Sequence, residues 1–291
     1  MPPRTPFLLA AAGIGLAVTT ARLHLSAAGL VQTALGSALL VASSAAALNA
    51  SRVRALPASR AVPAVLACTA ANAVTPAGLG GSALMVRLHT RTGLSGDEAF
   101  AAVTLRALAS GLAGIVVASV AAATLGLDGP SLPGGSTGPL VLAALLAGAV
   151  VLAFACPHRR NRAADHARRT AAAVGTVLSR PWRAAALLLG GIGVVAAQLL
   201  ILDGAVRAVG GDVGVGALLV TLLGSSAARA AVPSPGGIGP VEAALVAGLA
   251  ALGIPMAAAA VAVGVYRTAG LWLPVLCGVL ALRRLRVLGL L

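Results

Sequence analysis

The sequence predicts an all-α, polytopic helical membrane protein with about six full spans and two re-entrant hairpins in an inverted repeat. Of its 291 residues, 59% are hydrophobic and only 10% are charged, and the mean hydropathy is +0.99. Water-soluble domains usually carry a charge on about a quarter of their residues. The composition therefore predicts a single transmembrane domain that occupies residues 1–291.

Hydropathy divides the chain into eight apolar segments. They cover approximately residues 6–23, 25–48, 61–86, 99–125, 139–156, 184–202, 213–252 and 257–282. A helix that crosses a bilayer needs about 20 apolar residues. The third and seventh segments contain clusters of proline and glycine, so each predicts two partial helices rather than one crossing.

The arginines in the connections set the orientation, because short arginine-rich loops stay in the cytoplasm. Arginines lie on both sides of segment 61–86, so this segment enters and leaves from the cytoplasm. The connection 157–183 and the tail after 282 are also arginine-rich, whereas the loop 126–138 has none. The charge map predicts a cell inner (cytoplasmic) membrane protein with both termini in the cytoplasm. It also predicts an outward-facing hairpin at 213–252, although three full crossings after Val213 would satisfy the same map.

The two halves carry matching breaks. The first begins at Pro76 and is followed by the helix that bears Arg106; the second begins at Pro235 and is followed by the helix that bears Arg267. Repeat 1 covers about residues 6–125, and repeat 2 covers about 139–282 with the opposite orientation. Matched breaks of this kind are typical of transporters whose substrate site lies between two repeats. Lipid cannot satisfy broken backbone, so the breaks are expected to meet inside the protein around a polar cavity.

Polar and ionisable residues near the breaks form the candidate site. Glu242 either caps the helix that begins near Pro240, or acts as a proton acceptor or as an anchor for a cationic or hydroxyl-bearing head group, because ionisable groups inside a bilayer are usually functional. The arginines either pair with Glu242, Asp97 or Glu98, or hold a lipid phosphate. The predicted substrate-binding residues are Arg229, Pro235, Gly236, Gly237, Gly239, Glu242, Arg267, Asn72, Pro76 and Arg106.

Four further features have structural interpretations. Asp97 and Glu98 follow Ser95 in a capping-box pattern. Asn72 and Gln198 are expected to form hydrogen bonds between helices. The glycines at 190–193 predict close helix packing, and the stretch 157–183 predicts an amphipathic helix on the cytoplasmic surface, with Trp182 at the head-group level.

Several functions are disfavoured. The histidines and the three cysteines are scattered, so neither a metal nor another cofactor is expected. The formal net charge is +14, yet aromatic residues make up only 2% of the chain, too few for stacking on nucleic-acid bases. Motifs such as the P-loop, His-Glu-x-x-His and Gly-x-Ser-x-Gly are absent from the sequence. These observations favour a non-enzymatic role.

The second break is the most specific motif. The run from Val232 to Glu242, the spacer to Gly253-Ile254-Pro255 and the helix to Tyr266-Arg267 resemble the lysylphosphatidylglycerol synthase/flippase transmembrane domain family. The resemblance covers nearly the whole chain in segment order. Many members carry an Arg and a Glu close behind the first break, where this chain has Gly78, Gly80, Gly81 and Ser82. The resemblance implies a stand-alone membrane domain, without the soluble synthase domain of the fused members, that translocates or handles lipids.

Three functions differ in kind. The first is a flippase-like translocase that moves a phospholipid or lipid-linked head group, with an anionic or lipid-linked head group as its ligand. The second is a membrane-embedded enzyme, or a subunit of one, in lipid or isoprenoid-linked head-group modification. The third is a scaffold for a soluble synthase partner supplied separately. The matched breaks favour the translocase.

Overall fold

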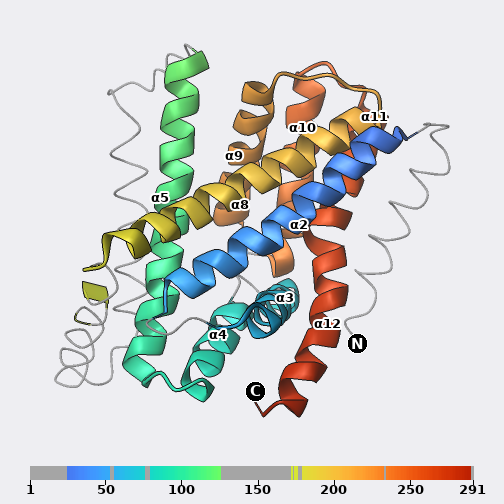
Figure 1. Ribbon diagram of the computed structural model, residues 1–291. Coiled ribbons are helices and arrows are strands. Elements are labelled where there is room, and N and C mark those ends of the chain that lie inside the picture. The colour runs from blue at the N-terminus through green and yellow to red at the C-terminus, as the bar shows by residue number, and fades with distance from the viewer. Residues whose placement is uncertain are drawn as a thin grey trace.

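The computed structural model describes residues 25–52, 56–75, 79–125, 172, 174–175, 179–232 and 234–289 (Figure 1). Every regular element in these ranges is a helix, which confirms the all-α prediction. Four helices there are long and apolar enough to cross a membrane. They are Ala27–Ala50, Gly96–Val120, Pro181–Ala208 and Met256–Val287. The predicted segments 6–23 and 139–156, the loop 126–138 and Pro76 lie outside the described residues.

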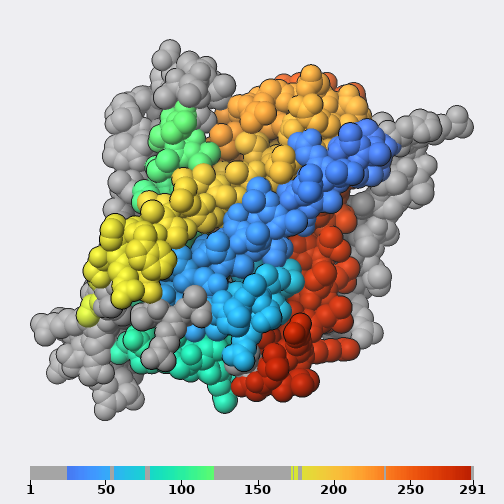
Figure 2. Space-filling view, in the orientation of Figure 1, coloured from blue at the N-terminus to red at the C-terminus, as the bar shows by residue number. Residues whose placement is uncertain are grey.

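The central pair of helices is α2 (Ala27–Ala50) and α8 (Pro181–Ala208), which run antiparallel across the molecule (Figures 1 and 2). Gly29 lies against Ala208 at one end, and Gly190 lies against Ala47 at the other. A Cβ atom on Gly29 would lie 2.5 Å from the backbone nitrogen of Ala208. The two backbones therefore approach closely along a surface of small residues, as the glycines at 190–193 predicted.

The predicted segment 61–86 consists of two helices, α3 (Ala58–Val74) and α4 (Leu79–Arg91). Side chains at the end of α3 cap α4 across the break. The Gly81 N–H donates to Asn72 Oδ1 at 2.7 Å, and the Gly80 N–H donates to Thr75 Oγ1 at 2.8 Å. The cap needs glycine, because a Cβ atom at Gly81 would overlap the Asn72 side chain. The predicted bond from Asn72 is confirmed, whereas Gln198 forms none with the described residues.

A short turn leads from α4 into α5 (Gly96–Leu125), the long helix at the left of Figure 1. The Ser95 N–H donates to Glu98 Oε2 at 2.8 Å, and the Glu98 N–H donates to Ser95 Oγ at 3.3 Å. These reciprocal bonds confirm the predicted capping box. An acidic residue in this first turn also matches the positive end of the helix dipole.

After α8, the second half continues with α9 (Val215–Ala231), the short 3-10 turn η2 (Pro235–Gly237) and α10 (Pro240–Ala251). Then α11 (Met256–Arg267) passes through the π-helical turn η3 (Thr268–Trp272) into α12 (Leu273–Val287). The last predicted segment, 257–282, is thus interrupted. Pro274 has no N–H to donate and crowds the carbonyl four residues earlier, which explains why the backbone widens just before it.

The predicted surface helix over 157–183 lies mostly outside the described residues, and its C-terminal end is wrong. Helix α8 already begins at Pro181, and Arg183 is buried and donates from Nη1 to the Arg52 carbonyl at 3.1 Å. Trp182 is exposed, and its ring lies 5.1 Å from the Arg183 guanidinium. Arg183 therefore ties α8 to the end of α2 instead of facing the membrane surface.

We expect Gly29→Val to destabilise the α2–α8 pair by about 1–3 kcal/mol, because the added atoms overlap the α8 backbone. The apparent melting temperature in detergent measures the effect. Gly114→Val is the matched control, since Gly114 also lies within a helix but has no atom within 4 Å of a Cβ placed there. Equal losses in the two variants would contradict the packing argument and point to helix propensity.

Candidate functional site

The second break is a turn that only glycine accommodates. Gly236, Gly237 and Gly239 have φ angles of 62°, 70° and 100°. Residues with a Cβ atom rarely adopt these values. Pro235 opens the turn, and Pro240 is the first residue of α10, where its fixed φ suits a helix start and its missing N–H is no loss.

Glu242 and Arg267 join at this turn. Glu242 Oε2 accepts the Gly239 N–H at 2.7 Å, and Glu242 Oε1 accepts from Arg267 Nε at 2.5 Å. Arg267 Nη2 donates to the Gly236 carbonyl at 3.0 Å. The Arg267 side chain is 8% exposed and that of Glu242 is 31% exposed. The capping and ion-pair interpretations of Glu242 are therefore both correct, since each oxygen serves one of them.

The second break touches the first half of the chain. A Cβ atom on Gly236 would lie 3.4 Å from the Cα of Ala73, near the end of α3. The α9–α10 hairpin turns in the middle of the molecule beside α3 (Figure 1). The described side of the first break, which includes Asn72, thus adjoins the turn that binds Arg267.

Arg229 completes the cluster from the last turn of α9. Its side chain is exposed, and its aliphatic stem packs on Gly237, where a Cβ atom would lie 2.8 Å from Arg229 Cδ. Arg229 forms no hydrogen bond or ion pair with the residues that the structure describes. Two guanidinium groups and one carboxylate therefore surround the second break, which leaves a net positive site.

The sequence of the chain matches the family model described as the lysylphosphatidylglycerol synthase TM region over residues 6–278. The chain belongs to this family. None of the curated proteins compared with the chain matches it. Membership confirms the resemblance carried by the second break. With the four candidate spans, it identifies a multi-pass membrane protein that interacts with membrane lipids and acts in lipid modification or flipping.

In this member of the lysylphosphatidylglycerol synthase TM family, Arg106 stands apart from the second break. It lies in α5, one turn after Val103, which packs against the core cluster around α3, α4 and α12. Its charge is within electrostatic range of Cys68 and His89. No hydrogen bond or ion pair joins it to Arg267 or to any other described residue.

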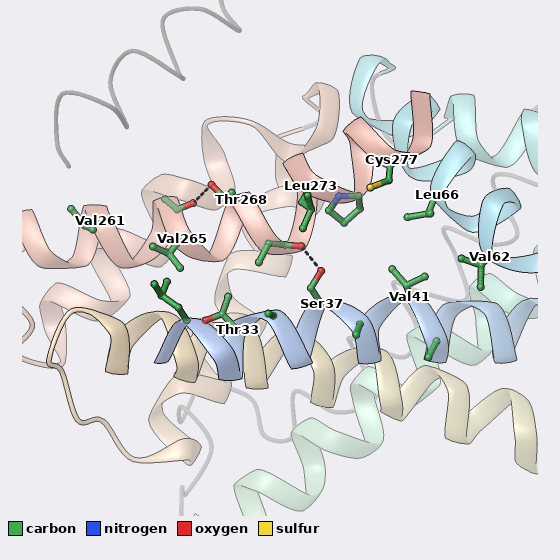
Figure 3. Close-up of a pocket in the computed structure, with 17 residues that line it drawn as sticks. Thr33, Ser37, Val41, Val62, Leu66, Val261, Val265, Thr268, Leu273 and Cys277 are labelled. Atoms are coloured by element: carbon green, nitrogen blue, oxygen red, sulfur yellow. Dashed lines mark hydrogen bonds between the residues drawn. The ribbon is translucent and has the colours of Figure 1, made fainter. Parts of the chain in front are cut away.

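An apolar groove lies between α2, α3 and the α11–η3–α12 helix, with a volume of about 750 Å³ (Figure 3). Its hydroxyl groups are already bonded to backbone carbonyls. Thr33 donates to Gly29, Ser37 donates to Ala269, and Thr268 donates to Gly264. The groove suits hydrocarbon, and none of the predicted site residues lines it.

A buried polar cluster at the end of α2 was missed at the sequence level. Arg52 is 2% exposed; its Nη1 lies 2.9 Å from His89 Nδ1, and its Nη2 donates to Thr92 Oγ1 at 2.8 Å. A guanidinium can only donate, so His89 Nδ1 accepts and the proton of the neutral ring lies on Nε2. His89 is fully buried, and its Nε2 has no partner among the described residues. The only sequence signal was a histidine within an arginine-rich connection.

We expect Glu242→Gln to destabilise the protein by about 1–3 kcal/mol, because it leaves the Arg267 charge unpaired near a partly exposed site. Arg267→Gln and the double variant complete a thermodynamic cycle measured by melting in detergent. The double variant should recover part of the loss. Asp212→Asn is the control, because Asp212 is 90% exposed and lies 3.9 Å from Arg207. Strictly additive losses would contradict a direct coupling between Glu242 and Arg267.

Burial, together with the charges of Arg52 and Arg106, lowers the pKa of His89 to about 4. Unfolded chains bind this proton near pH 6.5, so between pH 6.5 and 4 the unfolded state binds more protons than the folded state. Stability should therefore fall as the pH decreases through this window, by up to about 1.4 kcal/mol per pH unit. His89→Asn, which keeps an acceptor for Arg52, should reduce this slope in pH-dependent melting. An unchanged slope would assign the pH dependence to other groups.

Proposed function

We propose that this protein is an integral membrane lipid translocase that moves a phospholipid or lipid-linked head group between leaflets of the cytoplasmic membrane. The observation that carries the proposal is the Arg267–Glu242 ion pair at the broken backbone, beside Ala73 of the other half. A partly buried ion pair at such a break is costly to maintain, and polar groups at membrane depth usually mark a substrate path. Family membership supports a lipid as the substrate.

The proposed binding step is an exchange of partners at Arg267. In the described state its guanidinium bonds to Glu242 and to the Gly236 carbonyl. A lipid phosphate presents oxygens that match the fork of a guanidinium, so it can replace the carboxylate. Glu242 then takes up a proton or turns to a hydroxyl of the head group. The Gly239 N–H keeps the carboxyl group in place during this exchange.

The proposed movement follows from an inverted repeat. Helices α2 and α8, which correspond in the two predicted repeats, run antiparallel along a surface of small residues. This arrangement supports opposite orientations of repeat 1 and repeat 2. In the proposal, the hairpins α3–α4 and α9–α10 rock about the α2–α8 pair and expose the head-group site to one leaflet at a time. The acyl chains remain in lipid, and the apolar groove offers them a matching surface.

A second candidate function has one observation in its favour. The family is described as the membrane region of a lysylphosphatidylglycerol synthase. The protein would then be the membrane subunit of a lipid-modifying assembly, with a soluble synthase as its partner. A complex with such a partner that modifies lipid head groups, combined with no lipid movement by the purified chain, would favour this function.

A vesicle assay tests the translocase. Purified protein is reconstituted into phosphatidylcholine vesicles that contain fluorescently tagged phosphatidylglycerol, and a membrane-impermeant reductant bleaches the outer leaflet. Wild-type protein should make the inner-leaflet probe accessible, and Glu242→Gln should slow this movement by about tenfold or more, because the exchange at Arg267 is lost.

Glu98→Gln is the matched control for Glu242→Gln. Glu98 also accepts a backbone N–H three residues earlier at a helix start, but no arginine pairs with it in the described residues. Vesicles with the Glu98→Gln variant should move the probe at the wild-type rate. If the reductant bleaches no larger fraction of the probe in vesicles with wild-type protein than in protein-free vesicles, the translocase is refuted.

A further inference from the structure

The carboxylates of the described residues already have partners. Both oxygens of Glu242 are bonded, one to Arg267 and one to the Gly239 N–H. Asp203 accepts from Gln32 at 2.6 Å and from Arg207 at 2.9 Å, and Asp212 faces Arg207 from an exposed position. Glu98 caps α5, and Asp97 beside it also has a partner. An ammonium group entering the molecule would therefore find no open carboxylate among these residues.

The donors, in contrast, are in excess. Arg106 and Arg229 have no hydrogen-bond or ion-pair partner within the described ranges. The Nε2–H of the buried His89 is also unpartnered there, and Arg106 lies within electrostatic range of that ring. Arg106 lies in one of the apolar helices that can cross a membrane. A guanidinium without a partner among the described residues can donate to the oxygens of a ligand without giving up an existing bond.

From this imbalance we infer that the protein selects its lipid by charge: it binds head groups whose phosphate carries no ammonium and rejects aminoacylated, cationic ones. The inference rests on the proposed translocase function and names its substrate class. Arg267 and Arg229 are the positive groups that would bind the phosphate in the second half, and Arg106 is a separate positive group in the first half. The family is described as the TM region of a lysylphosphatidylglycerol synthase, and the inference has this chain handle a lipid without the lysyl group.

The physical reason is the low dielectric of the site. Two like charges repel far more strongly near protein and hydrocarbon than in water. An ammonium that accompanies a phosphate toward Arg267 would face Arg229 as well, and the two guanidinium groups outnumber the one carboxylate of Glu242 whether or not Glu242 stays bonded to Arg267. A phosphate without an ammonium is attracted by both guanidinium groups and satisfies the open donors. The same chemistry would suit a soluble phosphate ester, so the test must separate lipid from soluble ligand.

The test compares two lipids in the vesicle assay. Fluorescent phosphatidylglycerol and its fluorescent lysyl ester are placed in separate phosphatidylcholine vesicles with wild-type protein. Phosphatidylglycerol should move about tenfold faster than the ester, which corresponds to a difference of ~1.4 kcal/mol. Arg106→Gln should slow phosphatidylglycerol and reduce this ratio. Arg87→Gln, which removes an exposed arginine of α4, should leave the ratio unchanged.

The outcomes separate the two proposals. Equal rates for both lipids with the wild-type protein would overturn the charge selection and leave the translocase standing. No movement of either lipid would refute the translocase, and the selection with it. Uptake of radiolabelled glycerol phosphate by the same vesicles at the rate of phosphatidylglycerol would overturn the lipid as the source of the phosphate. The wild-type ratio decides the inference even if Arg106→Gln fails to fold.

Discussion

The structure depends on how a membrane protein satisfies a broken backbone and a buried charge together. A break in a helix leaves carbonyl and N–H groups that lipid cannot bind. The second break solves this with one ion pair, in which Arg267 binds the Gly236 carbonyl and Glu242 binds the Gly239 N–H. The charged groups provide hydrogen bonds for the open backbone groups, and the folded backbone holds the two charges next to each other. This mutual dependence fixes α10, α11 and the end of α9 around one point.

The same solution recurs with neutral groups. Asn72 and Thr75 bind the first N–H groups of α4 across the first break. At the π-helical turn after Arg267, the Ser37 hydroxyl of α2 donates to the Ala269 carbonyl at 2.8 Å. Each irregular stretch thus receives a polar partner from a neighbouring element. The irregular stretches of the two halves are therefore linked to the elements that pack around them.

The sequence predicted the features that depend on local chemistry. Proline and glycine clusters marked both breaks, the Ser95–Glu98 spacing marked the cap of α5, and the glycines at 190–193 marked close packing. It did not predict which oxygen of Glu242 would bind which partner, because both interpretations are locally reasonable. Nor did it predict the inward turn of Arg183 or the Arg52–His89 contact. These depend on where α2, α4 and α8 meet, which local pattern does not encode. Charge counting treated Arg183 as a surface residue because most arginines of membrane proteins are.

The two halves are not equivalent at their arginines, and this limits how the proposed translocase would work. In the proposed binding step Arg267 would give up an existing carboxylate partner, whereas Arg106 has none to give up among the described residues. The two arginines therefore hold a phosphate with different affinities, the unpaired one more tightly for equal geometry and burial. This asymmetry cannot drive net transport, because a ligand shifts only equilibria for which it has differential affinity and supplies no energy itself. In the proposed translocase it would set which orientation of the empty carrier prevails and how long the lipid stays on each side. Net movement would then come from the lipid gradient or from a coupled ion, and Glu242, which would lose its charge partner when Arg267 binds the lipid, is the group through which a proton would couple.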